Sequence, residues 1–498
     1  MPLKIIQHAI GLHLHQPAGA LLKLLQQDEG ELRRILLCYE RLARHAHKYA
    51  HVARLHVALS GVLLEQLHDP AFIKASRHLA DIPAILDSLR SAPNIEFVGT
   101  GYRHASLPLI PSEDWEEQLR NERVTMESVL GRVLKGYFPP ASRFTLELIP
   151  ALVRAGYEYV LLPNTALLTP DGHGTDPYRA YRLRHLDASI DVVPWDRGFS
   201  LAQESGMDAA WLADEARNGV AQSPESGAPY LLTTWSDGDA GEWFRRMDEE
   251  QGFYGHFFSP CMEFCETGEF PVQPIQLAEY LRDHRPETEV DLVQEMQAET
   301  LVASLGAEAQ AARKRLFAVV ARYWSVVRLS AAKSGPSRAT LQEARELILQ
   351  AEESDFLLDA SRCGEMLDML ERADKLLAAE PAQPKKAAQP EPAHQHGKSA
   401  APEIKKLLEP PAVRPSEQTT PAKSPVIPKV GNPPPGKPDV ELTLPKEGNP
   451  LSGKLVAGKS DKIAPPAPSV PPPARKGATT KAGKTVQSRS MKKKTHKK

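Results

Sequence analysis

The sequence IGLHLHQP, residues 10–17, forms the end of an apolar run near the start of the chain. Side chains alternate between the two faces of a β-strand, so His13 and His15 share one face and the leucines share the other. Pro17 has no amide hydrogen and ends the strand. The pattern predicts a first strand that presents two imidazoles at its C-terminal end, where α/β barrels carry their functional residues.

The composition of the chain changes at about residue 380. Residues 381–498 hold 23 Lys and Arg against 8 Asp and Glu, a charge of +15, and residues 1–380 hold 38 against 55, a charge of −17. The C-terminal part has 23 prolines and no Phe, Tyr or Trp, so it cannot offset its ordering entropy by burial. We expect a disordered basic tail over residues 381–498.

Three roles are open for this tail. The first is a solvated tether. The second is weak, salt-dependent contact with anionic surfaces or nucleic acid, without base stacking because aromatic residues are absent. The third is docking onto the acidic body of the same chain.

Cysteine content and hydropathy bear on location. The four cysteines are too few for a disulfide framework in a chain of 498 residues. The N-terminal residues lack the features of a signal peptide. No apolar run approaches the roughly 20 residues that span a bilayer. We expect a cytoplasmic protein without a membrane span.

Short apolar runs alternate with amphipathic stretches through the first 290 residues. Strands are predicted, besides the first, at residues 54–60, 94–101, 157–162, 189–194 and 230–234. Helices are predicted at residues 31–51, 61–68, 81–90, 112–130 and 145–155. In the first of these helices, His45, His47 and His51 are expected on a solvated face. Such alternation predicts an α/β fold with a mostly parallel sheet, either closed as a barrel or doubly wound.

From Pro274 onward the pattern is helical only. Helices are predicted at residues 275–283, 303–329, 340–353 and 363–379, with a turn at 333–337. We therefore expect three parts: a β/α barrel over residues 1–290, a helical domain over 291–380 and the tail over 381–498.

Polar clusters follow four of the predicted strands. They are His13 with His15, then His104, then Asp196 with Arg197 after Trp195, and finally Asp237 with Asp239. The carboxyl ends of parallel strands meet at one edge of a sheet, so this distribution favours the barrel.

Three interpretations of the histidine pair remain open from spacing alone. Imidazoles at this spacing can bind zinc, with His104, Asp196 or Asp237 as further ligands. They can also hydrogen-bond a sugar, a role in which the amide of Gln16 fits. In the third interpretation the histidines are structural.

The segment WSDGDAGEWF, residues 235–244, combines three carboxylates with two tryptophans. Trp235 and Trp243 could stack on the C–H faces of a sugar while the carboxylates bind its hydroxyls. An acidic surface turn is the simpler alternative, but such a turn would not ordinarily contain three large aromatic residues.

Taken together, the motifs resemble glycoside hydrolase family 57. The resemblance rests on HLHQP, NIEFVGTGY, GYFPP with FTLELIPALVRAGYEYVLL, WDRGFSLAQESG, TTWSDGDAGEWF and QAEESDF, in this order. It implies a seven-stranded β/α barrel followed by a helical domain. It also implies action on α-glucans as an amylase, glucanotransferase or branching enzyme, by a retaining mechanism with no required metal or other cofactor.

The resemblance also implies roles for individual residues. Asp237 would be the general acid/base, and Ala141 stands at the position of the nucleophile. The substrate-binding residues would be His13, His15, Gln16, His104, Trp195, Asp196, Arg197, Trp235, Asp239 and Trp243. No metal ligand is implied.

Ala141 departs from what retaining hydrolysis requires. A retaining enzyme places a second carboxylate about 5 to 5.5 Å from the acid, and a methyl group cannot attack an anomeric carbon. We therefore expect a protein that binds α-linked glycan with lost or reduced hydrolysis. The alternatives are an active α-glycosidase or 4-α-glucanotransferase with a displaced nucleophile, an inverting variant that uses Asp239, and a metal-dependent hydrolase that uses the histidine pair.

Overall fold

The computed structural model of the chain describes residues 5–224, 227–330 and 336–378. All of them belong to one compact unit, Met1–Ala393. The predicted tail, residues 381–498, and most of the turn expected at 333–337 lie outside the described residues. Within the described residues, no helix is both long and apolar enough to cross a membrane.

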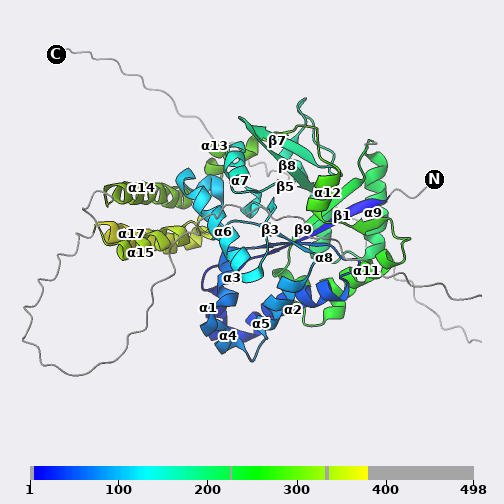
Figure 1. The fold of residues 1–498 in the computed structure, drawn as a ribbon, viewed down its shortest axis with the longest axis horizontal. Coiled ribbons are helices and arrows are strands. Elements are labelled where there is room, and N and C mark those ends of the chain that lie inside the picture. The colour runs from blue at the N-terminus through cyan, green and yellow to red at the C-terminus, as the bar shows by residue number, and fades with distance from the viewer. Residues whose placement is uncertain (1–4, 225–226, 331–335, 379–498) are drawn as a thin grey trace, which may run out of the picture. The chain divides into compact units, whose positions relative to one another are not determined.

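A parallel sheet centred on β1 (Ile6–Leu14) forms the body of the protein (Figure 1). On one side of β1 the strands follow in the order β2 (Leu55–Leu59), β3 (Ile95–Gly99), β4 (Gly136–Tyr137), β5 (Tyr159–Pro163) and β8 (Ala188–Trp195). On the other side β1 pairs with β9 (Tyr230–Asp237). The amide of Asp196 donates to the carbonyl of Thr233 at 2.9 Å and joins the end of β8 to β9. Seven parallel strands therefore form the barrel that the sequence predicts.

Five strands were not predicted, namely the two-residue β4 of the barrel and four further strands. β10 (Val272–Pro274) pairs with the start of β1, and β7 (Tyr181–His185) pairs antiparallel with β8. β6 (Leu167–Leu168) and β11 (Asp291–Leu292) form a separate pair. The sequence of β7, YRLRH, is mostly polar, so it carries little of the apolar signal on which strand prediction depends.

Helices follow most strands of the barrel, and six of them coincide with predicted helices: α2 (Glu29–Lys48), α3 (Gly61–His68), α5 (Ile82–Ser91), α6 (Trp115–Leu130), α7 (Ile149–Arg154) and α12 (Leu277–Asp283). The others in this part are α1 (Ala20–Gln27), α4 (Pro70–Ser76), α8 (Arg197–Ser205), α9 (Ala209–Gln222), α10 (Gly241–Arg245) and α11 (Ser259–Glu266). Leu277 and Tyr280 of α12 belong to the same buried cluster as Ala9 and Ala58 of the barrel strands. The inner face of the barrel is therefore packed, as in other β/α barrels.

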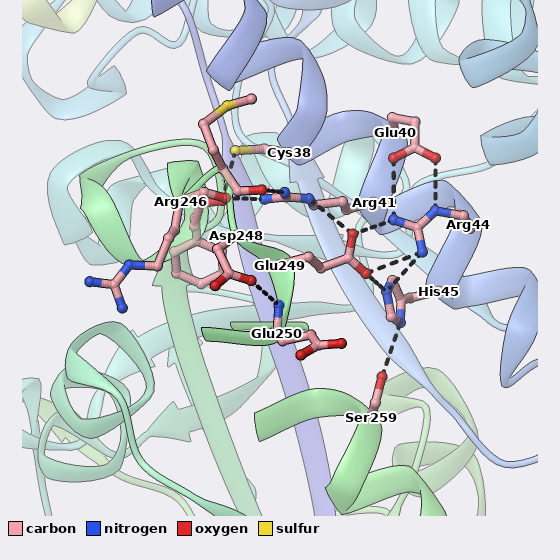
Figure 2. Close-up of polar contacts among 12 residues, drawn as sticks. Cys38, Glu40, Arg41, Arg44, His45, Arg246, Asp248, Glu249, Glu250 and Ser259 are labelled. Atoms are coloured by element: carbon pink, nitrogen blue, oxygen red, sulfur yellow. Dashed lines mark hydrogen bonds and ion pairs between the residues drawn. The ribbon is translucent and has the colours of Figure 1, made fainter. Parts of the chain in front are cut away.

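His45 corrects one prediction for α2. We expected its side chain in solvent, but it is buried. Its Nε2 lies 2.7 Å from Glu249 Oε1 and its Nδ1 lies 3.3 Å from Ser259 Oγ (Figure 2). Arg41 and Arg44 also bind Glu249, so the cluster ties α2 to the segment that follows α10. Helical periodicity places a residue on a face, but it does not reveal that a loop 200 residues away covers that face.

The C-terminal helices are α13 (Ala298–Ala303), α14 (Ala307–Ser330), α15 (Arg338–Ala351), α16 (Ser354–Leu358) and α17 (Cys363–Ala378). In Figure 1, α14, α15 and α17 lie side by side. Arg345 of α15 donates to the fully buried Asp114 at 2.8 Å. Farther along, Ala105 and Glu353 form an antiparallel bridge. The helical region is thus joined to the barrel near the loop that carries His104.

Candidate functional site at the C-terminal end of the barrel

An aromatic pair lies inside the barrel beneath the predicted site. The rings of Trp235 and Phe138 stack with centroids 4.7 Å apart. Gly11 of β1 faces Trp235 so closely that a Cβ atom on Gly11 would lie 1.9 Å from the indole. Only glycine leaves room for the indole here, which explains why an apolar strand contains this residue. The pair forms a rigid apolar layer below the polar residues.

Three imidazoles stack above this layer. The ring of His104 lies 4.8 Å from that of His13 and 3.9 Å from that of His15, centroid to centroid. Nδ1 of His15 contacts Ser60 Oγ at 2.8 Å, and Nδ1 of His104 contacts Ser354 Oγ at 3.0 Å. Burial lowers the pKa of His15 and of His104, and the neighbouring histidines lower it further. These two imidazoles are therefore neutral at physiological pH.

Asp237 ends β9 beside His13, whose Nδ1 donates to Asp237 Oδ1 at 3.0 Å. The side chain of His13 is 12% exposed and that of Asp237 is 62% exposed. The hydrogen bond from His13 lowers the pKa of Asp237 below its ordinary value. The carboxyl group is therefore ionised at neutral pH and available to a ligand from solvent.

Asp239 and Gln16 bind each other in the interior. Asp239 is buried, and its Oδ2 accepts from Gln16 Nε2 at 3.1 Å and from Tyr39 OH at 2.6 Å. Burial raises the pKa of Asp239 to about 6. This carboxyl group holds the loop after β9 against the barrel. The geometry does not favour it as a base that activates water, although its contact with substrate stays a prediction.

The remaining predicted contacts are spread around the site. Trp195 is half-buried, and its Nε1 atom is buried without a hydrogen-bond partner among the described residues. Asp196 caps α8 by accepting from the amide of Phe199 at 3.0 Å, and Arg197 is exposed. Trp243 packs against His256 with ring centroids 5.6 Å apart. Their roles in substrate binding stay predictions, and Trp243 is already in contact with the protein on one face.

Ala141 follows β4 and Phe138 in a short turn. Its side chain is exposed, and both Ala141 and Ser142 have positive φ, 50° and 54°. Two consecutive residues other than glycine in the left-handed region are uncommon and mark a strained turn. Neither Ala141 nor Ser142 brings a carboxylate to this turn.

Two carboxylates near the site were missed in the sequence. Glu204 of α8 accepts from the amide of Asp237 at 3.3 Å, and burial and the charge of Asp237 raise its pKa. Asp355 of α16 has ligand atoms within 4.8 Å of those of His15 and His104. Glu204 belongs to the quoted segment WDRGFSLAQESG, so a signal for it was present. Asp355 belongs to the quoted segment QAEESDF, but the sequence does not show that this segment of the helical region lies beside the histidines.

These observations define the protein as a seven-stranded β/α barrel with a polar site at the carboxyl ends of its strands. Residues 10–218 match the family model described as glycosyl hydrolase family 57. The matched residues include the histidine pair and Ala141 but end before Asp237.

The chain is also similar to known proteins in sequence or in structure. Alpha-amylase 1 of Dictyoglomus thermophilum is 24% identical over 194 residues, which are 38% of this chain and 26% of that protein. The crystal structure of 4-alpha-glucanotransferase from Thermococcus litoralis is similar with a TM-score of 0.54 at 19% identity, covering 75% of this chain and 60% of that one. The alpha-amylase AmyC from Thermotoga maritima gives a TM-score of 0.55 at 13% identity, covering 75% and 93%.

These likenesses show the fold. The matched stretch spans about a quarter of the curated amylase, and this chain covers about three-fifths of the glucanotransferase structure.

Proposed function

We propose that this protein binds α-linked glucan at the C-terminal end of the barrel and has lost, or strongly reduced, retaining hydrolysis. The match of residues 10–218 to the family model, and similar proteins named as an amylase and a glucanotransferase, support the class of ligand. The imidazole and carboxylate groups at the barrel opening supply hydrogen-bond donors and acceptors of the kind that sugar hydroxyls need.

The absence of a carboxylate at Ala141 carries the proposal of lost hydrolysis. A retaining enzyme needs one carboxyl group as acid and a second as nucleophile. The negative charge of a nucleophile would also raise the pKa of the acid, because two like charges disfavour ionisation. Ala141 supplies neither effect, and the pKa of Asp237 is lowered by His13. Asp237 is therefore poorly suited to donate a proton at neutral pH.

The test is turnover and binding with amylose and maltooligosaccharides. We expect the wild-type chain to bind them in affinity electrophoresis and to release no reducing ends. Ala141→Glu should release reducing ends at least about tenfold faster than Ala141→Gln, a difference of about 1.4 kcal/mol in the barrier. The glutamine variant is the matched control because it has nearly the same size and no nucleophile. Wild-type turnover that disappears in Asp237→Asn would overturn the proposal.

Glu204 supports a second candidate, an active enzyme with a displaced nucleophile or acid. Its Oε1 accepts from the amide of Asp237, and its pKa is raised. This candidate predicts wild-type turnover that is lost in Glu204→Gln as well as in Asp237→Asn. Glu204 lies on α8, the helix that precedes β9, and Asp237 is on β9. The two carboxylates therefore lie on the same side of the site, whereas a nucleophile must lie on the opposite face of the sugar from the acid. We therefore rank this candidate second.

The expected cytoplasmic location and the weak contacts of the basic tail with anionic partners stay predictions. Attachment of the full chain to heparin at low salt, lost when residues 381–498 are removed, would support the latter.

A further inference from the structure

The imidazoles of His13, His15 and His104 share an unusual feature. In each ring, Nδ1 has a partner, which is Asp237, Ser60 or Ser354 respectively. In each ring, Nε2 is buried and has no hydrogen-bond partner among the described residues. A buried polar atom without a partner loses the hydrogen bond that it makes with water in the unfolded chain, which destabilises the folded state. Three such atoms on stacked rings therefore point to a ligand that the protein alone does not supply.

Hydroxyl groups contact the Nδ1 atoms of the His15 and His104 rings and orient these rings. A histidine that binds a metal through Nε2 usually donates its Nδ1 hydrogen to an oxygen, which fixes the ring and its tautomer. Ser60 and Ser354 stand at that position for His15 and His104, at 2.8 and 3.0 Å. His104 is 7% exposed, and its ring is fixed in this orientation.

A carboxylate completes the donor set. Asp355 follows Ser354 directly, and the amide of Ser354 donates to the carbonyl of His104 at 3.3 Å. The ligand atoms of His15, His104 and Asp355 all lie within 4.8 Å of one another. Two nitrogens and one carboxylate oxygen are a donor set that zinc and similar divalent metals accept, with a fourth position left for water or substrate.

We propose that His15 Nε2, His104 Nε2 and the Asp355 carboxylate bind a divalent cation of the zinc class. A four-coordinate cation with bonds of about 2.0 to 2.2 Å holds its donor atoms about 3.3 to 3.6 Å apart, so side-chain rotations that bring the three groups closer together accompany binding. The proposal does not rest on glycan binding, since it concerns the free protein. It adds a site that spans the barrel and the helical region.

Arg362 competes with the cation. Its Nη1 lies 3.4 Å from Asp355 Oδ2, and its charge disfavours a positive charge at His15. Its Nη2 also lies 3.5 Å from the exposed Glu365, so the guanidinium has a second carboxylate to which it can turn. Removing the charge of Arg362 should therefore strengthen cation binding, which an adventitious surface site would not do.

The experiment uses the full chain, stripped with a chelator and titrated with Zn²⁺ alone by calorimetry and with Co²⁺ by visible absorption. We expect one tight ion per chain and a Co²⁺ spectrum typical of a four-coordinate site. His104→Ala and Asp355→Asn should each weaken binding by about 100-fold or more, since even changes behind the ligands cost 10- to 100-fold. Arg362→Met should bind about tenfold more tightly, which corresponds to one lost like charge of about 1.4 kcal/mol.

His173→Ala is the matched control, because His173 is an 81% exposed histidine far along the chain from the proposed ligands. It should bind as the wild type does. Equal affinity in the wild type and in Asp355→Asn, or no tight ion in the wild type, would overturn the proposal. Asp355→Asn keeps the shape of the side chain, so it remains informative if His104→Ala fails to fold. Glycan binding is measured separately on the stripped protein, so failure of one proposal is distinguishable from failure of the other.

Discussion

At the scale of single residues, Gly11 and Trp235 fit together in the centre of the barrel. The indole occupies the space where a Cβ on Gly11 would stand, and it also stacks on Phe138. Trp235 lies two residues before Asp237 on β9, so its position also sets the position of the carboxylate.

Gly11→Ala tests this fit. The added methyl group must displace the indole, and overpacking of this kind costs about 1 to 3 kcal/mol of unfolding free energy. Urea unfolding should show the loss. Gly364→Ala is the control, since nothing lies within 4 Å of the Cβ position of this α17 residue, and alanine should stabilise that helix by up to about 1 kcal/mol. An unchanged stability of Gly11→Ala would contradict the close contact.

At the scale of elements, the segment from Glu353 to Arg362 connects α15 to α17 and lies against the histidines. Glu353 is fully buried, accepts from the amide of Ala18 at 3.3 Å and lies 3.8 Å from Arg362. Burial raises the pKa of Glu353 from 4.5 to about 7. Ionisation of Glu353 therefore disfavours the packing of this segment against the barrel.

The sign of this pH dependence follows from the two pKa values. Below about pH 4.5 the carboxyl group is protonated in both states and imposes no penalty. Between about pH 4.5 and 7 the unfolded state ionises first, so stability falls as pH rises, by up to about 3 kcal/mol. Above pH 7 the full penalty is present.

Glu353→Gln should remove this penalty because the amide imitates the protonated acid. We expect the variant to gain about 1 to 3 kcal/mol relative to the wild type at pH 8 and little at pH 5, measured by urea unfolding at both values. Glu365→Gln, on the 63% exposed neighbour of Arg362, should show no such difference. A variant that is equally affected at pH 5 and pH 8 would contradict the raised pKa.

At the scale of the whole molecule, a buried charge cluster joins the barrel to the helical region. Arg345 of α15 donates to Asp114 at 2.8 Å and to Glu117 at 2.7 Å, and Asp114 is fully buried. Glu352, also buried, accepts from Gln118 at 2.6 Å. The residues that follow Glu352 contact His104, so this contact also positions Asp355.

Arg345→Met should cost about 3 to 5 kcal/mol, because it leaves the carboxylate of Asp114 buried without a cation. Arg345→Met combined with Asp114→Asn should recover part of the loss. Arg315→Met is the control, since Arg315 is 41% exposed in its ion pair with Asp374, and such pairs contribute about 0 to 1 kcal/mol. Equal losses in the two single variants, measured by chemical unfolding, would contradict a special role for the cluster.

The sequence by itself determined the alternation of strands and helices and the shared face of His13 and His15. These features are local: apolar period and chain order define strands, helices and motifs without knowledge of distant contacts. The local pattern did not predict β7 or the burial of His45. The side chains in both places are polar, and they gain their partners only in the folded chain.

Only the tertiary structure decided which groups meet at the barrel opening. In the folded chain Asp239 is buried against Tyr39, and Glu204 lies beside Asp237. Asp355 lies close to His15 and His104. Its neighbour Ser354 contacts His104 across a separation of 250 residues in the sequence. Such contacts depend on barrel closure and on the docking of the helical region. The quoted motifs contain Glu204, Asp239 and Asp355, but they do not show which groups these residues contact, because the free energy that favours the contacts comes from packing between elements rather than from any single segment.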